Sequence, residues 1–363
     1  MAAGLARRLS PTALFAWLAA PFESLHRRSK GEDRLYATLP GETRAELGRL
    51  LEPAVARLEA QRQETVAAVD SVAIRAMPAA LLAGGALTLV SGQGLALALA
   101  VGAGLALAAF WLVQLRPAAN YVRAARASFG SEVAAYLSDF EYYARTAPDL
   151  RRIGRWKLFP RVLDPLMDDY MTGSRDGRQV ALYRLGITYR EAGGRAGSAR
   201  RLTAVCVEAE TGPGCTGAVV LLPRWANAAL RAGPAGTHGL LPVAACDGAL
   251  EPEYEVFAES PSECGLLLNP AMCDRIRALA GRQAALHPDR IPVLVFLPGY
   301  LAALFPLRDG VALFTPPPFW RPLDPQATLA QLAADLATKH AILMETLELG
   351  PNGLPDPDEP ERP

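Results

Sequence analysis

The most constraining feature of this sequence is a run of 40 residues without a charged side chain, at residues 76–115. The polar sequence Ser-Gly-Gln-Gly interrupts the run once, at residues 91–94. As a helix, residues 95–115 would be about 31 Å long, which matches the roughly 30 Å hydrocarbon core of a bilayer. Residues 76–90 are shorter, so they either cross with one end in the interface or form a buried or re-entrant helix. The run therefore predicts a transmembrane hairpin of two helices.

The arginines that flank the run predict its orientation. Arg62 and Arg75 precede the first helix, Arg116, Arg123 and Arg126 follow the second, and the connecting turn has no charge. Positively charged flanks stay in the cytoplasm, so both long flanks and both termini are expected on the cytoplasmic side. Only the short turn would reach the opposite face of the membrane.

Small residues recur at every fourth position in both helices, which lets helix backbones approach closely in lipid. They form one stripe in the first helix and two in the second: Ala80, Gly84, Thr88 and Gly92; Ala96, Ala100, Gly104 and Ala108; Ala98, Gly102 and Ala106. One interpretation is that the two helices pack only on each other. The other adds a homo-oligomeric contact, or a contact with another membrane protein, because the second helix has two stripes and one hairpin partner.

The flanking segments predict a helical stalk and an N-terminal surface helix. Apolar residues recur every three or four positions in residues 41–75 and again in residues 116–147, which favours two amphipathic helices packed as an antiparallel stalk. Residues 1–40 contain a short apolar stretch after Arg7 and Arg8. A signal peptide would require a small-residue cleavage site, which is not evident there, so a short helix that lies on the cytoplasmic leaflet as an interfacial helix or packs on the stalk is favoured.

The pattern changes in residues 148–349, where alternating apolar residues and Gly-Pro turns become frequent. Strands are expected at residues 179–190, 201–208, 217–222, 292–297, 300–306 and 311–314, and helices at residues 164–171, 270–286 and 325–349. Asp324 is placed to cap the last helix. Strand pairs joined by short turns, with helices between and after them, predict an antiparallel α+β domain. Residues 350–363, which are rich in proline and acidic residues, are expected to be disordered.

The order of these elements resembles a known family. An amphipathic helix, a two-span hairpin, a second helix and the strand near residue 179 are followed by the segment YEVFAESPSECGLLLNPAMCDR at residues 254–275. This order is similar to that of the bacterial membrane proteins of domain-of-unknown-function family 3137, over residues 40–349. The resemblance implies an inner-membrane protein with two spans and a cytoplasmic α+β domain. It brings no activity, cofactor or catalytic residue.

Composition and motifs argue against several functions. The chain has 37 basic and 37 acidic residues, and this zero net charge gives nucleic-acid binding no support. A G-x-G-x-x-G pattern at residues 212–217 precedes an expected strand instead of the helix that a dinucleotide site requires, so it is interpreted as a hairpin turn. The five cysteines lack a zinc-ligand spacing and are expected to be free thiols in a reducing cytoplasm. No cofactor or metal is predicted.

Groups that could perform catalysis are isolated in the sequence. The four histidines have no neighbouring residue that would form a nucleophile pattern, and no complete catalytic motif is present. Whether the chain is an enzyme is left open, with a non-enzyme favoured. Glu253, Glu255 and Glu259, beside an expected strand at residues 254–258, are the carboxylates that could line a pocket.

The densest basic cluster comprises Arg151, Arg152, Arg155 and Lys157, interleaved with Trp156 and other apolar residues. One interpretation is contact with anionic lipid, worth about 1 kcal/mol per charge near the surface. The other is a solvated helix face with Trp156 in the core. The sequence as a whole favours a scaffold or interaction protein anchored in the lipid bilayer. The alternative is a membrane-tethered enzyme or ligand-binding domain whose pocket the sequence does not define.

Overall fold

The computed structural model describes residues 11–12, 41–92, 94–137, 139–190, 199–211, 215–245, 248–307 and 316–350. These residues fall into two compact units. The helical unit comprises Met1–Phe129 and Leu313–Asp335, and the globular unit comprises Gly130–Ala312 and Leu336–Pro363. The expected interfacial helix, the strand at residues 311–314 and the disordered tail concern residues that lie almost wholly outside the described ranges.

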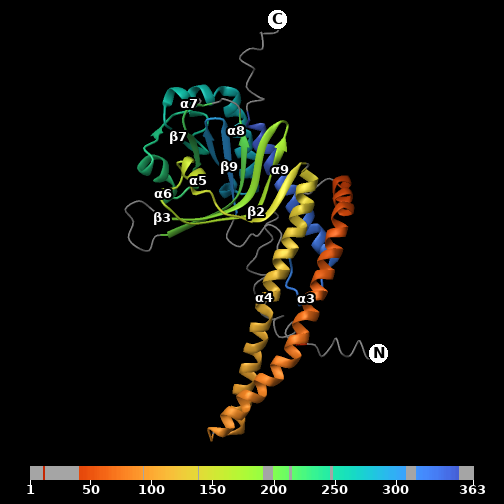
Figure 1. Cartoon of the computed structure of the whole chain (residues 1–363). Coiled ribbons are helices and arrows are strands. Elements are labelled where there is room, and N and C mark those ends of the chain that lie inside the picture. Colours follow the sequence, from red (N-terminus) through yellow and green to blue (C-terminus); the bar gives the residue numbers. More distant parts are fainter. Residues whose placement is uncertain are drawn as a thin grey trace. The chain divides into compact units, whose positions relative to one another are not determined.

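Two long helices dominate the helical unit (Figure 1). α3 (Gly41–Val90) and α4 (Leu95–Leu137) each join an expected amphipathic segment and its apolar span into one continuous helix. Between them the chain turns at Gly92, which has φ of 77°. Glycine adopts this left-handed conformation without steric penalty. The predicted helical hairpin is therefore present.

Small residues bring α3 and α4 into close contact. A Cβ atom at Gly102 would lie 2.7 Å from the Leu81 carbonyl oxygen, and a Cβ atom at Gly84 would lie 2.7 Å from Leu105 Cδ1. At Gly102 the clash is with the backbone of α3, so only glycine fits there, whereas at Gly84 the nearest atom belongs to a side chain. Ala98, Gly102 and Ala106 form the buried stripe of α4, whereas Ala96, Ala100, Gly104 and Ala108 form an exposed stripe. The hairpin thus uses one of the two stripes of α4.

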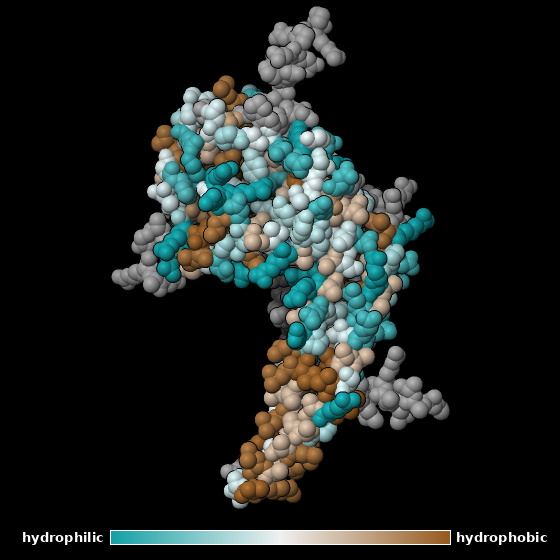
Figure 2. Space-filling view, viewed as in Figure 1, coloured by the Kyte–Doolittle hydropathy of each residue, from teal (hydrophilic) through white to brown (hydrophobic). Residues whose placement is uncertain are grey.

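The apolar part of the hairpin is exposed along its surface (Figure 2). Only 17% of the residues in the most apolar stretch of α3 are buried, and only 22% in that of α4. The core helix of a soluble protein would bury most of these side chains, and large exposed apolar surfaces are unusual in soluble proteins. Both helices are long and apolar enough to cross a membrane.

The described residues of the globular unit form a nine-stranded sheet in which every pairing is antiparallel (Figure 1). In spatial order its strands are β1 (Phe140–Thr146), β2 (Val162–Arg175), β3 (Arg178–Arg190), β4 (Ala199–Glu210), β9 (Tyr300–Pro306), β8 (Val293–Leu297), β5 (Val219–Pro223), β7 (Tyr254–Ala258) and β6 (Leu241–Pro242). The helical segments are α5 (Leu150–Arg155), α6 (Ala228–Arg231), η1 (Gly233–Thr237), α7 (Pro261–Leu267), α8 (Pro270–Leu286), η3 (Pro288–Arg290) and α9 (Pro325–Glu348), which enters this unit at Leu336. The expected antiparallel α+β architecture is confirmed.

Several expected elements appear with the expected bounds. α8 begins and ends at residues 270 and 286, and β8 and β9 form the hairpin with Leu297 opposite Tyr300. Asp324 caps α9, because its Oδ1 accepts hydrogen bonds from the backbone N–H groups of Gln326 and Ala327 at 3.0 and 3.2 Å.

Two expected helical segments are strands instead. Residues 164–171 belong to β2, which pairs with β1 on one side and β3 on the other. The β2–β3 hairpin closes at Asp176 and Gly177, both at positive φ, as a two-residue type I′ turn requires. The expected helix at residues 116–147 ends early, at Leu137, because the chain reverses at Asp139 (φ 44°) and residues 140–146 pair with β2.

The core positions α5 against one face of the sheet. Trp156, Leu158 and Phe159 are buried in a cluster that includes Tyr183 and other alternate residues of β3. Alternate side chains of β3 therefore face this core. On the opposite face of β3, Leu182 is also fully buried, whereas Arg184, Thr188 and Arg190 are partly exposed.

Candidate anion-binding site

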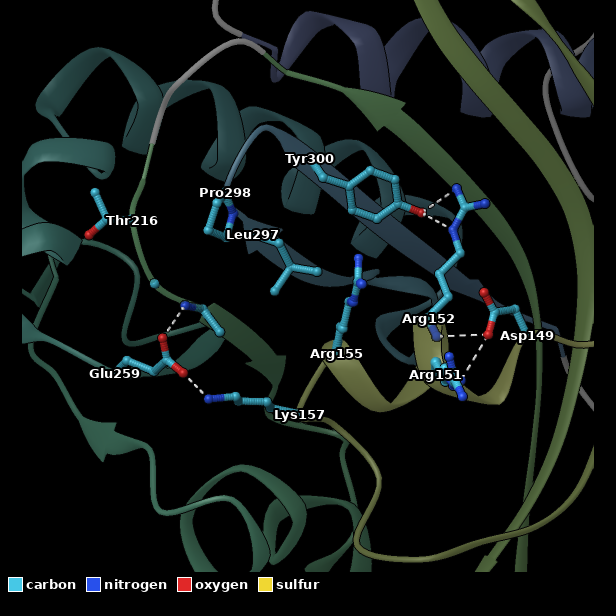
Figure 3. A pocket seen from close by; sticks show the side chains of 12 residues that line it. Asp149, Arg151, Arg152, Arg155, Lys157, Thr216, Glu259, Leu297, Pro298 and Tyr300 are labelled. Atoms are coloured by element: carbon cyan, nitrogen blue, oxygen red, sulfur yellow. Dashed lines mark hydrogen bonds and ion pairs between the residues drawn. The ribbon is translucent and has the colours of Figure 1, made fainter.

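All four basic residues of the predicted cluster line one pocket of the globular unit (Figure 3). Its volume is about 770 Å³, within the range of about 300–1,000 Å³ that is usual for small-molecule sites. The lining residues come from α5, the segment before β5, the end of β7 and the β8–β9 turn: Asp149, Arg151, Arg152, Arg155, Lys157, Thr216, Gly217, Ala218, Glu259, Leu297, Pro298 and Tyr300.

The local sequence accounts for both ends of α5. Asp149 caps its first turn by accepting hydrogen bonds from the backbone N–H groups of Arg151 and Arg152 at 2.9 and 3.2 Å. After the last turn, Lys157 lies between two fully buried side chains, Trp156 and Leu158, and has φ of 52°. The other described non-glycine residues with positive φ are all aspartates, which tolerate this conformation better than lysine does. Packing of its neighbours therefore holds Lys157 in an unfavourable backbone conformation beside the pocket.

The Arg152 side chain is held by contacts with other residues of the globular unit. Its Nε and Nη2 atoms donate hydrogen bonds to the Tyr300 hydroxyl at 2.9 and 2.7 Å, and the guanidinium forms an ion pair with Glu208 of β4. The Glu208 side chain is 0% exposed. Neither of its oxygens accepts a hydrogen bond of regular geometry from the described residues. Arg152 is therefore the group that compensates this buried carboxylate.

Burial and charge shift the pKa values of this network. Burial raises the pKa of Glu208, and the Arg152 guanidinium opposes that shift. Burial disfavours the charge on Arg152, but the Glu208 carboxylate holds the pKa of Arg152 above its ordinary value. Burial first, and the nearby Glu208 charge in addition, raise the pKa values of Tyr300, Tyr183 and Cys206. The Cys206 thiol is thus kept protonated, which argues against a role as a nucleophile.

Lys157 forms an ion pair with Glu259, whose other carboxylate oxygen accepts a hydrogen bond from the Ala218 backbone N–H at 3.0 Å (Figure 3). Glu259 is therefore the one member of the proposed carboxylate set that lines this pocket. Glu255 instead pairs with Arg224 and Arg231 and lines a second, smaller pocket. The structure does not bring the proposed carboxylates together, so the interpretation of a shared acidic pocket is wrong.

Arg151 and Arg155 differ from the other two basic residues, because neither has an ion-pair partner among the described residues. They lie four positions apart on α5 and share one helix face, and both side chains are exposed. Figure 3 shows Arg155 pointing into the space between Leu297 and Tyr300. Like charges at this spacing repel each other by about 0.2–0.5 kcal/mol. An anion bound between them would relieve this repulsion.

None of the described cysteines lines this pocket, and the G-x-G-x-x-G pattern contributes to it only through Thr216 and Gly217. Cys206, Cys215 and Cys264 are not in a disulfide, whereas Cys273 is disulfide-bonded, so the expectation of five free thiols is wrong at Cys273. The residues described by the structure contain no cluster of His, Cys, Asp and Glu that could hold a metal ion. Strand β5, not a helix, follows the G-x-G-x-x-G pattern, and residues 212–214 of the expected turn lie outside the described residues.

Sequence reasoning identified the basic residues but missed Glu208 and Tyr300. Arg152 and Tyr300 are 148 residues apart in sequence, and the register of β4 with β9 places Glu208 opposite Ala302. The only available signal is Glu208 itself, an acidic residue in the apolar strand sequence AVCVEA.

Comparisons with known proteins add little to this description. Neither protein-family models nor curated proteins match the sequence, so the resemblance to domain-of-unknown-function family 3137 stays a prediction. Among solved structures, the mycobacterial trehalose monomycolate transport factor A is similar with a TM-score of 0.28 and 13% identity, over 60% of this chain and 95% of that one. A similarity of this size supports no inference about fold or function. The chain is therefore classed by its own features: an α+β protein with a long apolar helical hairpin and a basic pocket.

Proposed function

We propose that the chain is a membrane-anchored ligand-binding protein. The hairpin of α3 and α4 inserts into the bilayer, and the globular unit binds a ligand with an anionic group in the α5 pocket. The observation that carries the proposal is the pair Arg151 and Arg155, which line the pocket without a carboxylate partner among the described residues. Unpaired cationic groups that line a concave site favour ligand binding over docking on a flat surface.

The binding test uses phenyl phosphate, a small soluble anion, and the full chain in a neutral detergent. Isothermal titration calorimetry should give saturable binding that weakens at least tenfold in the double variant Arg151→Gln/Arg155→Gln, because a charge-assisted hydrogen bond contributes about 1.5–3 kcal/mol. The matched control is Arg277→Gln, which removes an exposed arginine that pairs with Asp274 outside the pocket. Equal binding by the double variant and the control would contradict the proposal.

The membrane part of the proposal places the protein in the bacterial inner membrane with both flanks of the hairpin in the cytoplasm, supported by Arg75 and Arg116 at its two ends. Disulfides persist mainly in oxidising compartments, and Cys273 is disulfide-bonded, so the side of the globular unit needs a direct test. A membrane-impermeant maleimide should label a Ser91→Cys variant in intact cells, and Cys215 only after permeabilisation. Labelling of Cys215 in intact cells would overturn the orientation.

A second candidate function is a scaffold that self-associates in the membrane. The observation that favours it is the exposed stripe of α4, which consists of small residues and has no partner in the hairpin: Ala96, Ala100, Gly104 and Ala108. Such stripes let helices pack closely in lipid. Crosslinking in native membranes should trap homo-oligomers that Gly104→Leu abolishes. A chain that stays monomeric would remove this candidate and leave the ligand-binding proposal intact.

A further inference from the structure

Lys157 and Glu259 form the one ion pair in which both partners line the pocket, within the part of the chain that the structure describes. Their side chains are 33% and 37% exposed. A ligand in the pocket can therefore reach both of them. An ion pair exposed to this extent is weak, because water screens it and the two side chains lose conformational freedom.

Glu259 does not depend on Lys157 for its position. Its carboxylate accepts a hydrogen bond from the Ala218 backbone N–H, and its own backbone N–H donates to the Ala218 carbonyl oxygen at 3.0 Å. Lys157 can therefore leave the ion pair while Glu259 keeps both of its contacts with Ala218. The backbone of Lys157 is fixed between the buried side chains of Trp156 and Leu158, so its ammonium group can reach either Glu259 or a ligand nearby.

The charges available to a ligand follow from these contacts. Arg152 forms an ion pair with Glu208 and hydrogen bonds with Tyr300. Arg151, Arg155 and Lys157 are therefore the cations that can bind an anion in the pocket. A guanidinium group can donate two parallel hydrogen bonds to two oxygens of one phosphate, and the lysine ammonium adds a compact positive charge. A phosphate monoester offers three acceptor oxygens and close to two negative charges, whereas a carboxylate offers two oxygens and one charge.

Resting on the proposed function, we infer that the ligand carries a phosphate monoester group and that this group takes Lys157 from Glu259 when it binds. Glu259 is thus a built-in competitor that lowers the affinity of the pocket for weaker anions. A ligand with a carboxylate replaces one negative charge beside Lys157, that of Glu259, by another single negative charge. A dianionic phosphate interacts with three cations, and we expect these interactions to be stronger together than the Lys157–Glu259 ion pair that is broken.

The inference predicts a variant that binds more tightly than the natural chain. Glu259→Gln removes the competing charge but keeps an amide oxygen that can accept the Ala218 hydrogen bond, and it should tighten phenyl phosphate binding about threefold to tenfold. Lys157→Gln should weaken it about tenfold. The matched control is Asp274→Asn, which changes the net charge of the chain equally at an exposed site outside the pocket and should leave affinity unchanged.

Two further arms define the ligand class and its source. Benzoate, the carboxylate counterpart, should bind the full chain at least tenfold more weakly than phenyl phosphate at about pH 8, where the second ionisation of a phosphate monoester (pKa about 6) is complete. Neutral detergent micelles doped with phosphatidic acid, whose headgroup is a phosphate monoester, should compete with phenyl phosphate if the source is a lipid. Inorganic phosphate alone should compete equally well if the source is a small soluble phosphate.

Failure of this inference is distinguishable from failure of the proposed function. If Arg151→Gln/Arg155→Gln weakens binding but Glu259→Gln does not tighten it beyond Asp274→Asn, the pocket binds anions and the competitor role of Glu259 is wrong. If benzoate binds as tightly as phenyl phosphate, the phosphate class is wrong. If no variant in the pocket changes binding, the proposed function fails together with the inference.

Discussion

Replacing Arg152 by methionine should destabilise the globular unit, because the Glu208 carboxylate would remain buried without its counter-charge. Removing one partner of a buried ion pair costs about 3–5 kcal/mol. Glu208 is 0% exposed but Arg152 is 38% exposed, so water screens part of the interaction, and we expect a loss of about 2–4 kcal/mol in the free energy of unfolding. The methionine side chain is about as long as the aliphatic part of the arginine side chain. The loss in the free energy of unfolding therefore reflects mainly the missing positive charge.

Guanidinium unfolding of the full chain in neutral detergent, followed by circular dichroism, measures this loss. Arg277→Met is the matched control, because it breaks an exposed pair with Asp274 and should change the free energy of unfolding by at most about 0.5 kcal/mol. The double variant Arg152→Met/Glu208→Gln should recover most of the loss, since the buried charge is gone from it. A single variant as stable as the natural chain would refute the reasoning.

The same variant should show a defined pH dependence. Burial raises the pKa of Glu208, and Arg152 opposes the shift, so removing Arg152 raises the folded-state pKa further. The folded state then binds a proton that the unfolded chain has released, so this stabilisation is present at low pH and is lost as the pH rises through the folded-state pKa. The deficit of Arg152→Met should therefore shrink between about pH 8 and pH 5. A deficit that is constant or larger at low pH would show that lost packing, not charge, is its cause.

Three other predictions concern the hairpin, Lys157 and the cysteines. Gly102→Val should lower the melting temperature in detergent, because overpacking costs about 1–3 kcal/mol and its Cβ would lie 2.7 Å from the Leu81 carbonyl oxygen, whereas Gly104→Val, with nothing within 4 Å of its Cβ, should have little effect. Lys157→Gly should leave the free energy of unfolding unchanged or raise it by about 1 kcal/mol, since it relieves the left-handed strain but loses a weak ion pair. The affinity of this variant for phenyl phosphate should nevertheless fall. A fall in both the free energy of unfolding and the affinity would contradict the assignment of Lys157 as a ligand-binding residue. Maleimide labelling of the chain denatured without reductant should modify Cys206, Cys215 and Cys264 but not Cys273, and peptide mass spectrometry that finds Cys273 labelled would exclude its disulfide.

The sequence predicted the fold where its pattern was long or had a clear boundary. The two apolar helices, the 270–286 helix with Asn269 and Pro270 at its start, and the Pro298-Gly299 hairpin all follow from local residues. The sequence predicts a helix at residues 164–171, but these residues form a strand, for which Asp176-Gly177 is a strong hairpin signal. The apolar spacing of residues 116–147 continued through Phe140, but pairing of β1 with β2 ended the helix at Leu137.

The site was predictable only in part. The local sequence shows which residues are charged, but only the tertiary structure shows which residues they pair with. The cluster from Arg151 to Lys157 is visible as a count of basic residues. Arg152 forms its ion pair with Glu208 in β4, and Lys157 forms its ion pair with Glu259 at the end of β7. Both acidic residues are far from α5 in sequence. Only these distant partners distinguish Arg152, which compensates the buried Glu208, from Lys157, whose ion pair with Glu259 is exposed, and from Arg151 and Arg155, which have no ion-pair partner among the described residues.

The most direct test of the central claim is a diffraction experiment on the full chain soaked with tungstate, an analogue of phosphate. The account predicts an anomalous peak within hydrogen-bonding distance of the Arg151 and Arg155 guanidinium groups, which is lost in the Arg151→Gln/Arg155→Gln variant. Tungstate bound only at other sites, or a peak that persists in that variant, would contradict the account.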